Sequence, residues 1–277
     1  MNLDQVTLIG DAFDHSEGVA YFDGSWYAGG EAGQIWQIDA KANIAQVAAV
    51  PGMVLGLALD GDGTIYACDA GSRTVWQIDG PHVRAFCRGT PERPMVNPNW
   101  GVFGPTGEYW VSDSGHWQGN DGVIYRIDAK RTVTVWFSDA CHFPNGMALH
   151  PDGVHLYIVE STLPGISRVR IGSDGAPLDY QVVLRLERTV PDGIAFDQQG
   201  GLYIGYYRPD RIDYWAGAGR PEIFLDDWQG TVVAAPTNVA FGGHDYRDLL
   251  FASLGRWSLG KVRVDIPGAP LNYPKKR

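Results

Sequence analysis

The sequence predicts an all-β fold, a six-bladed β-propeller with four-stranded blades. Three observations support it: a strand–turn–strand pattern recurs six times, glycine and tryptophan are abundant, and few stretches have the periodicity of a long amphipathic helix. The 277 residues include 36 glycines and 10 tryptophans, and glycine at about 13% compares with about 7% in ordinary proteins. This composition is typical of many short strands joined by tight turns.

The repeated unit begins with a polar or small residue, continues into an alternating apolar strand and turns at a glycine into a second strand. Successive copies start 38, 44, 46, 47 and 46 residues apart, which fits a propeller blade of about 40 to 50 residues. Six blades leave no room for a second domain, so we expect residues 1–277 to form a single β-propeller. The copies begin at Glu17, Leu55, Asn99, Asn145, Asp192 and Asn238.

The two ends of the chain predict how the ring closes. A strand at residues 5–9 precedes the first copy, and the last copy has strands near 238–242, 249–253 and 261–265. We therefore expect the N-terminal strand to supply the outer strand of the last blade. Closure of this kind removes exposed sheet edges.

Charge and composition exclude several classes of function. The formal net charge is −10, and the only basic cluster is the terminal Lys275-Lys276-Arg277, which we interpret as a solvated tail; a nucleic-acid partner is not expected. The three cysteines, Cys68, Cys87 and Cys141, are far apart and predict buried side chains rather than disulfides or a thiolate metal site. With no leader-like N-terminus and no membrane-length apolar run, we expect a cytoplasmic monomer with no membrane contact.

The first residue of each copy is where we expect the chemistry. The first strand of a propeller blade lines the central channel, so these six residues should point into one mouth at one level. Two carboxylates and three amides around one axis form a ring of oxygen donors, which suits one hard divalent cation; Leu55 should contribute no ligand. The alternative is that each Asp or Asn only forms a turn before its strand, but Glu17 is not a residue that turn chemistry selects.

Four short motifs resemble the SMP-30/gluconolactonase family of regucalcin-like propellers, and the resemblance covers nearly the whole chain. They are Ser16-Glu17-Gly18, Phe143-Pro144-Asn145-Gly146-Met147-Ala148, Val190-Pro191-Asp192-Gly193-Ile194-Ala195 and Pro236-Thr237-Asn238-Val239-Ala240-Phe241-Gly242-Gly243. The resemblance implies a hydrolase that opens a sugar-type or related small lactone. It also implies that Glu17, Asn145 and Asp192 bind the metal, with Asn99 as a fourth ligand, direct or through water.

One motif departs from the family pattern. Sugar-lactone members of the animal type carry Arg-x-Asn-Asp around the ligand of the third blade, whereas this chain has Asn97-Pro98-Asn99-Trp100. The arginine that grips substrate oxygens is absent and an aromatic residue replaces the aspartate. The metal ligand is kept, but the identity of the lactone is left open.

The mechanism we expect is attack of water on a lactone carbonyl polarised by the cation, with Asp192 as the general base. Calcium is the first candidate for the cation, and magnesium, manganese or zinc are the alternatives. Loops that follow the second strands should return to the mouth, which places Asp69, Asp113 and Glu160 near it as supporting residues. The predicted substrate-binding residues are Asn97, Trp100, His116, Trp117, Tyr206 and Arg208.

Two other functions share these features. A related propeller hydrolase acting on organophosphates or phosphoesters would use the same ring with different pocket contacts. A propeller that only binds calcium would need the ligands without turnover. A propeller that serves only as a protein-interaction module needs no polar ring at the channel mouth, so Glu17 and Asp192 together argue against that class.

Overall fold

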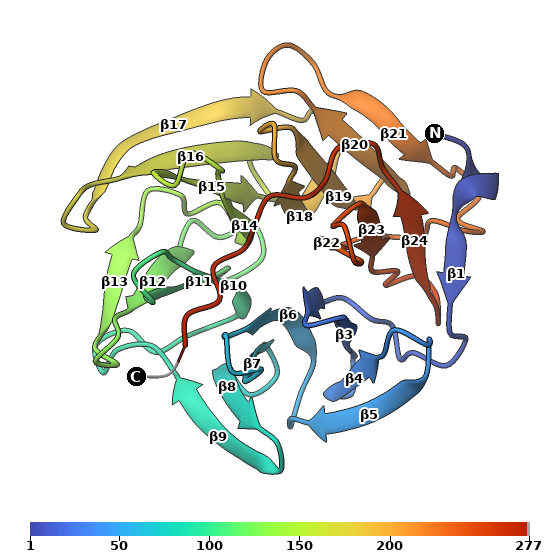
Figure 1. The fold of residues 1–277 in the computed structure, drawn as a ribbon. Helices are drawn as coiled ribbons and strands as arrows, with labels where there is room; N and C mark the ends of the chain where they lie inside the picture. The colour runs from blue at the N-terminus through green and yellow to red at the C-terminus, as the bar shows by residue number, and fades with distance from the viewer. Residues whose placement is uncertain (276–277) are drawn as a thin grey trace.

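The computed structural model describes residues 1–275, and its strands form six four-stranded antiparallel sheets arranged as a ring. Figure 1 shows the sheets following one another around a central axis, each contributing one inner strand. This confirms the predicted six-bladed β-propeller. Lys276 and Arg277, predicted to belong to a solvated tail, lie outside the described residues, whereas Lys275 is exposed as expected.

Blades 1 to 3 follow the chain in order from the inner to the outer strand. Blade 1 has β2 (Val19–Phe22), β3 (Ser25–Gly29), β4 (Gln34–Ile38) and β5 (Ile44–Ala49). Blade 2 has β6 (Val54–Leu59), β7 (Ile65–Asp69), β8 (Thr74–Asp79) and β9 (His82–Cys87). Blade 3 has β10 (Pro98–Phe103), β11 (Tyr109–Asp113), β12 (Val123–Ile127) and β13 (Val133–Phe137).

Blades 4 and 5 repeat this order, and blade 6 uses both ends of the chain. Blade 4 has β14 (Pro144–Leu149), β15 (His155–Glu160), β16 (Gly165–Ile171) and β17 (Pro177–Arg185). Blade 5 has β18 (Val190–Phe196), β19 (Leu202–Arg208), β20 (Arg211–Trp215) and β21 (Glu222–Asp226). Blade 6 has β22 (Val239–Gly242), β23 (Asp248–Phe251), β24 (Leu259–Arg263) and β1 (Thr7–Ile9), which follows a 3₁₀ turn, η1 (Leu3–Gln5).

Closure of the ring occurs as the sequence predicts. Strand β1 pairs antiparallel with β24, with Thr7 opposite Lys261 and Ile9 opposite Leu259. The first strand of the chain therefore completes the blade that the last strands begin, and the hydrogen bonds of this pairing hold the two ends of the chain together.

The hydrophobic core is divided among the seams between blades. Six clusters of buried side chains each span two neighbouring blades, because the two faces of every sheet pack against the sheets on either side. Cys68 and Cys87 are buried in the cluster between blades 2 and 3, and Cys141 is half-buried; none of the three is in a disulfide within residues 1–275. Nor does this part of the chain contain a helix long and apolar enough to cross a membrane.

A C-terminal segment crosses one end of the central channel (Figure 1). Ala269 N donates to Phe196 O at 2.8 Å, and the Tyr273 hydroxyl donates to Tyr21 O at 2.9 Å. Asn272 Nδ2 donates to Phe103 O at 3.1 Å. The segment thus joins the C-terminal ends of inner strands from blades 5, 1 and 3. It covers a mainly apolar cavity of about 100 Å³ inside the channel, and the opposite end of the channel holds the polar ring.

Candidate metal and active site

Five polar residues open the inner strands at the uncovered end of the channel, and all five are buried. They are Glu17, Asn99, Asn145, Asp192 and Asn238. Leu55 occupies the same position in blade 2 and is buried as an apolar side chain. The structure therefore has five polar groups and one apolar group at one level of the channel.

Glycines bring the blades close together at this level. A Cβ atom added to Gly18 would lie 2.9 Å from Leu55 O, and one added to Gly146 would lie 2.6 Å from Asp192 O. A Cβ atom on Gly193 would lie 2.7 Å from Thr237 O and would collide with the Asn238 side chain. In blades 1, 4 and 5 the residue after the ring residue must therefore be glycine, because the backbone of the next blade occupies the space of a side chain.

Two serines, one near the end of a second strand and one directly after another second strand, fix residues at the ring. Ser112 Oγ accepts a hydrogen bond from Trp100 N at 3.0 Å and donates one to Asn145 O at 2.8 Å. Ser161 Oγ accepts from Asn145 Nδ2 at 3.2 Å and donates to Pro191 O at 2.7 Å. The amide nitrogen of Asn145 is therefore engaged by Ser161, whereas its Oδ1 has no hydrogen-bond partner among the described residues.

Several polar atoms of the ring lack hydrogen-bond partners among the described residues. This is true of Asn99 Oδ1, Asn145 Oδ1 and Asp192 Oδ1, and of both amide atoms of Asn238. A buried polar atom without a hydrogen-bond partner costs about 1–3 kcal/mol. Because several such atoms lie together at the ring, they indicate that a further species binds there and supplies their missing partner. Carboxylate and amide oxygens are the ligand types that hard divalent cations prefer. The residues present fit such a cation.

The two ring carboxylates have strongly perturbed acidities. Burial raises the pKa of Asp192 to about 8, and its contact with the Asn145 side chain offsets only part of this increase. Burial also raises the pKa of Glu17 well above its usual range, and the nearby charge of Asp192 raises it further. Two buried carboxyl groups that disfavour each other's charge are stabilised by a cation placed between them.

Carboxylates at the ends of second strands anchor the loops that lead to the ring. Asp113 accepts hydrogen bonds from Val96 N at 2.9 Å and Asn97 N at 2.6 Å, just before Asn99. Asp69 accepts from Gly52 N at 3.1 Å, and Glu160 from His142 N at 3.2 Å, in the corresponding loops of blades 2 and 4. Through these hydrogen bonds the three carboxylates fix the loops that lead into the inner strands.

The predicted substrate-binding residues fall into two groups. His116 and Trp117 lie on the loop between β11 and β12, with Trp117 53% exposed, and Arg208 is the exposed last residue of β19. His116 Nδ1 is 2.7 Å from Asp121 Oδ2, and Arg208 Nη1 is 3.1 Å from Asp210 Oδ1. These side chains are accessible to a small molecule at the mouth.

The other three are less accessible. Trp100 packs in the cluster between blades 3 and 4, and Tyr206 is fully buried with its hydroxyl donating to Asp213 Oδ2 at 2.8 Å. Asn97 is half-buried and its backbone is held by Asp113. The structure does not bring Trp100 and Tyr206 to the surface of the mouth, so their contribution to substrate binding stays a prediction and would act through packing.

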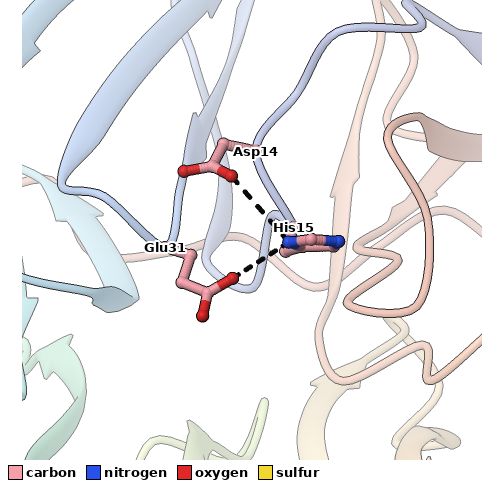
Figure 2. A group of neighbouring side chains, drawn as sticks. All are labelled: Asp14, His15 and Glu31. Atoms are coloured by element: carbon pink, nitrogen blue, oxygen red, sulfur yellow. Dashed lines mark hydrogen bonds and ion pairs between the residues drawn. The ribbon is translucent and has the colours of Figure 1, made fainter.

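Two features at the mouth add to what the sequence predicts. Asn238, predicted as one of the three amides of the ring, is its most deeply buried polar member. The second feature is His15, to which the sequence assigns no role; its Nδ1 lies 2.9 Å from Glu31 Oε2 and 3.8 Å from Asp14 Oδ1 (Figure 2). No short-range pattern connects His15 with Glu31 because the contact depends on the first hairpin.

Comparisons with known proteins agree with this architecture. A family model described as the SMP-30/gluconolactonase/LRE-like region matches residues 16–255. A 6-deoxy-6-sulfogluconolactonase from Pseudomonas putida is 30% identical over 189 residues, an alignment that spans 61% of this chain and 62% of the relative.

Two solved structures share the fold. A gluconolactonase from Xanthomonas campestris superposes with a TM-score of 0.80 at 16% identity, covering 95% of this chain and 89% of the other. A regucalcin from Agrobacterium tumefaciens, described as a calcium-binding protein, superposes with a TM-score of 0.76 at 19% identity, covering 97% and 95%. At these identities the likeness extends to the fold.

Proposed function

Because the chain belongs to the SMP-30/gluconolactonase/LRE-like family, we propose that it is a metal-dependent lactonase that opens a sugar-type or related small lactone. The observation that supports the proposal most strongly is the ring of buried oxygen atoms without partners, of which Asn99 Oδ1, Asn145 Oδ1 and Asp192 Oδ1 are members. The named activity of the Pseudomonas putida relative, a sulfogluconolactonase, supports the same class of reaction.

In this proposal Glu17, Asn145 and Asp192 hold one divalent cation, and Asn99 is a fourth ligand, direct or through water. Calcium is the first candidate, because carboxylates and neutral amide oxygens are the ligands it takes in proteins. Magnesium, manganese and zinc are the alternatives. A bound cation would polarise the lactone carbonyl and stabilise the negative charge that develops on its oxygen.

Asp192 is the proposed general base. Its Oδ1 has no hydrogen-bond partner among residues 1–275, so it is free to accept a proton from an attacking water. Contact with the Asn145 side chain orients the carboxyl group and favours its charged form. The high pKa that burial imposes on the metal-free carboxyl must fall when the cation binds, since a neutral carboxylic acid cannot act as a base.

The substrate is expected to enter from the loops around the mouth. His116, Trp117 and Arg208 are proposed to contact it, and Asn97, Trp100 and Tyr206 are proposed to shape the site behind them. Loops on a rigid propeller are the usual location of specificity. The departure of residues 97–100 from the family's sugar-acid pattern leaves room for a lactone other than a simple sugar lactone.

Hydrolysis of a lactone panel by metal-stripped protein, with Ca²⁺, Mg²⁺, Mn²⁺ or Zn²⁺ added back, tests the proposal. We expect proton release that depends on the added metal. This release should be lost in Glu17→Gln and kept in Glu187→Gln. Glu187 is exposed and provides the same substitution away from the ring. Tight metal binding without turnover of any lactone would contradict the lactonase assignment and favour a phosphoester substrate or a calcium-binding role.

A further inference from the structure

Three of the ten tryptophans are more than half exposed, and all three lie on loops at the metal-site end of the propeller. Trp117 is 53% exposed in the loop between β11 and β12, and Trp257 is 57% exposed in the loop between β23 and β24. Trp228 is 85% exposed between β21 and β22. These loops join strand ends that lie at the same end of the blades as Glu17 and Asp192. Large exposed aromatic surface concentrated on one face indicates a ligand-contacting surface.

Two of these indoles lean against residues that immediately precede the ring. The Trp257 ring centroid is 5.2 Å from that of His15, and Glu17 is two residues farther along the chain. The Trp117 ring centroid is 4.8 Å from that of Phe143, and Asn145 is two residues farther along. His15 and Phe143 share a left-handed backbone, with φ of 42° and 57°. The same local turn therefore places an aromatic pair beside each of two proposed metal ligands. We call these two pairs, His15–Trp257 and Trp117–Phe143, the aromatic walls of the mouth.

The two walls stand on opposite sides of the mouth. Inner strands of successive blades contact one another around the ring in chain order, and β22 contacts β2 to complete it. Blades 1 and 4 are therefore opposite, as are blades 3 and 6. The first wall joins Trp257 of blade 6 to His15 at the entrance of blade 1, and the second joins Trp117 of blade 3 to Phe143 at the entrance of blade 4.

Both walls are held in place by histidine–carboxylate pairs. His15 Nδ1 lies 2.9 Å from Glu31 Oε2 (Figure 2). Asp14 Oδ2 accepts a hydrogen bond from Ala32 N at 2.9 Å. Phe13 N also donates to Trp257 O at 2.9 Å. On the other side, Asp121 accepts from His116 N at 3.0 Å and contacts His116 Nδ1 at 2.7 Å, one residue before Trp117. The indoles are thus positioned before any ligand binds.

The chemistry of the walls favours an uncharged occupant with a ring. The first wall carries two carboxylates, Asp14 and Glu31, for one histidine. Arg256, next to Trp257, is half-buried and donates to Gly230 O at 3.4 Å, and Arg208, the last residue of β19, is paired with Asp210. The exposed surfaces that the walls offer a ligand are indole faces, which bind flat apolar groups and the C–H faces of sugar rings.

We propose that the His15–Trp257 and Trp117–Phe143 walls bind an uncharged ring substituent, glycosyl or aryl, carried by the lactone, so that the preferred substrate is larger than a single compact sugar lactone. This inference rests on the proposed lactonase function. It adds Trp257 and His15 to the specificity-determining residues. It also explains why an aromatic mouth surrounds a site that lacks the family's substrate-gripping arginine.

The test measures kcat/KM of the calcium-loaded protein for two matched pairs of lactones. The first pair is glucono-1,5-lactone and the same lactone carrying a glucosyl group at O4. The second pair is an unsubstituted five-membered lactone and its aryl-substituted form. The wild type is expected to prefer the ring-bearing member of at least one pair. Trp117→Ala and Trp257→Ala should each reduce that preference about 3- to 10-fold through KM. Trp117→Phe and Trp257→Phe should recover most of it, and Trp228→Ala should keep the wild-type preference.

The pair that shows the preference separates a glycosyl from an aryl substituent. Turnover with no preference for ring-bearing lactones, or a preference that both alanine variants leave unchanged, would overturn the inference while the lactonase function stands. Absence of turnover on every lactone would contradict the lactonase function itself. In that case calorimetry of ring-bearing lactone binding to the calcium-loaded protein decides on the walls: weaker binding after Trp257→Ala and Trp117→Ala supports them, and equal binding overturns them.

Discussion

The carboxyl groups of Glu17 and Asp192, from blades 1 and 5, are near enough for the charge of Asp192 to raise the pKa of Glu17. Both groups are buried, and burial is the larger cause of each shift. An arrangement of this kind stores electrostatic repulsion that a cation relieves.

The stability of the metal-free protein should fall as pH rises from about 4 to about 8. Both carboxyl groups have raised pKa values in the folded state. For Asp192 the folded pKa is about 8, whereas its pKa in the unfolded chain is about 4. Between these two pH values the folded protein therefore binds more protons than the unfolded chain. The free energy of unfolding therefore decreases through this window. Calorimetric melting temperatures at pH 5, 6.5 and 8 measure it, and Asp192→Asn should flatten the dependence. If the melting temperature of the wild type falls with pH no more steeply than that of Asp192→Asn, the raised pKa of Asp192 is contradicted.

Binding of the cation should release protons. At pH 7 the metal-free pair holds a proton on at least one carboxyl group, and the cation must displace it because only the ionised oxygens are good ligands. Titration calorimetry of Ca²⁺ in buffers with different ionisation enthalpies should show release of at least one proton per chain at pH 7. Release should decline toward pH 9. Binding enthalpies that are independent of the buffer would show that the pair is already ionised.

Gly193→Ala should disturb the ring at the seam between blades 5 and 6. The new Cβ atom would lie 2.7 Å from Thr237 O and would collide with the Asn238 side chain, so the two blades must separate or the amide must move. Overpacking of this kind costs about 1–3 kcal/mol, and metal affinity should fall with it. A denaturation midpoint of Gly193→Ala equal to that of the wild type would show that the blades are not closely packed at Gly193.

The C-terminal segment should contribute to stability without contributing to chemistry. Tyr273 donates to Tyr21 O at 2.9 Å and packs edge-on against Phe22 at 5.2 Å between ring centroids. Tyr273→Phe should cost about 1 kcal/mol for the lost hydrogen bond, and Tyr273→Ala about 3 kcal/mol. Chemical denaturation measures both, and metal affinity should be unchanged because the ring lies at the other end of the channel. A loss of metal affinity in Tyr273→Phe would indicate that the two ends are coupled.

The sequence predicts the blades and the ring well because both follow the repeat. Glu17, Asn145 and Asp192 start copies of one pattern, and a propeller brings the starts of its inner strands to one level. The closure of β1 on β24 is likewise a consequence of counting strands in the last copy.

Contacts outside the repeat could not be predicted in this way. The neighbours of His15 and Trp257 lie on different blades, and their meeting depends on loop conformations that no periodicity encodes. Tyr206 follows the rule for second-strand ends but turns into the core, where Asp213 satisfies its hydroxyl. The C-terminal segment has no repeat at all, so its path across the channel depends on individual hydrogen bonds such as that between Tyr273 and Tyr21.

The measurement that tests the central claim most directly is the titration of metal-stripped protein with Ca²⁺ while lactone hydrolysis and metal occupancy are followed together. The account predicts that turnover rises in proportion to occupancy and reaches its maximum at one ion per chain. It also predicts that Asp192→Asn remains inactive at any calcium concentration at which it is loaded. Turnover that persists in the metal-stripped protein, or that is unchanged in loaded Asp192→Asn, would contradict the proposed site.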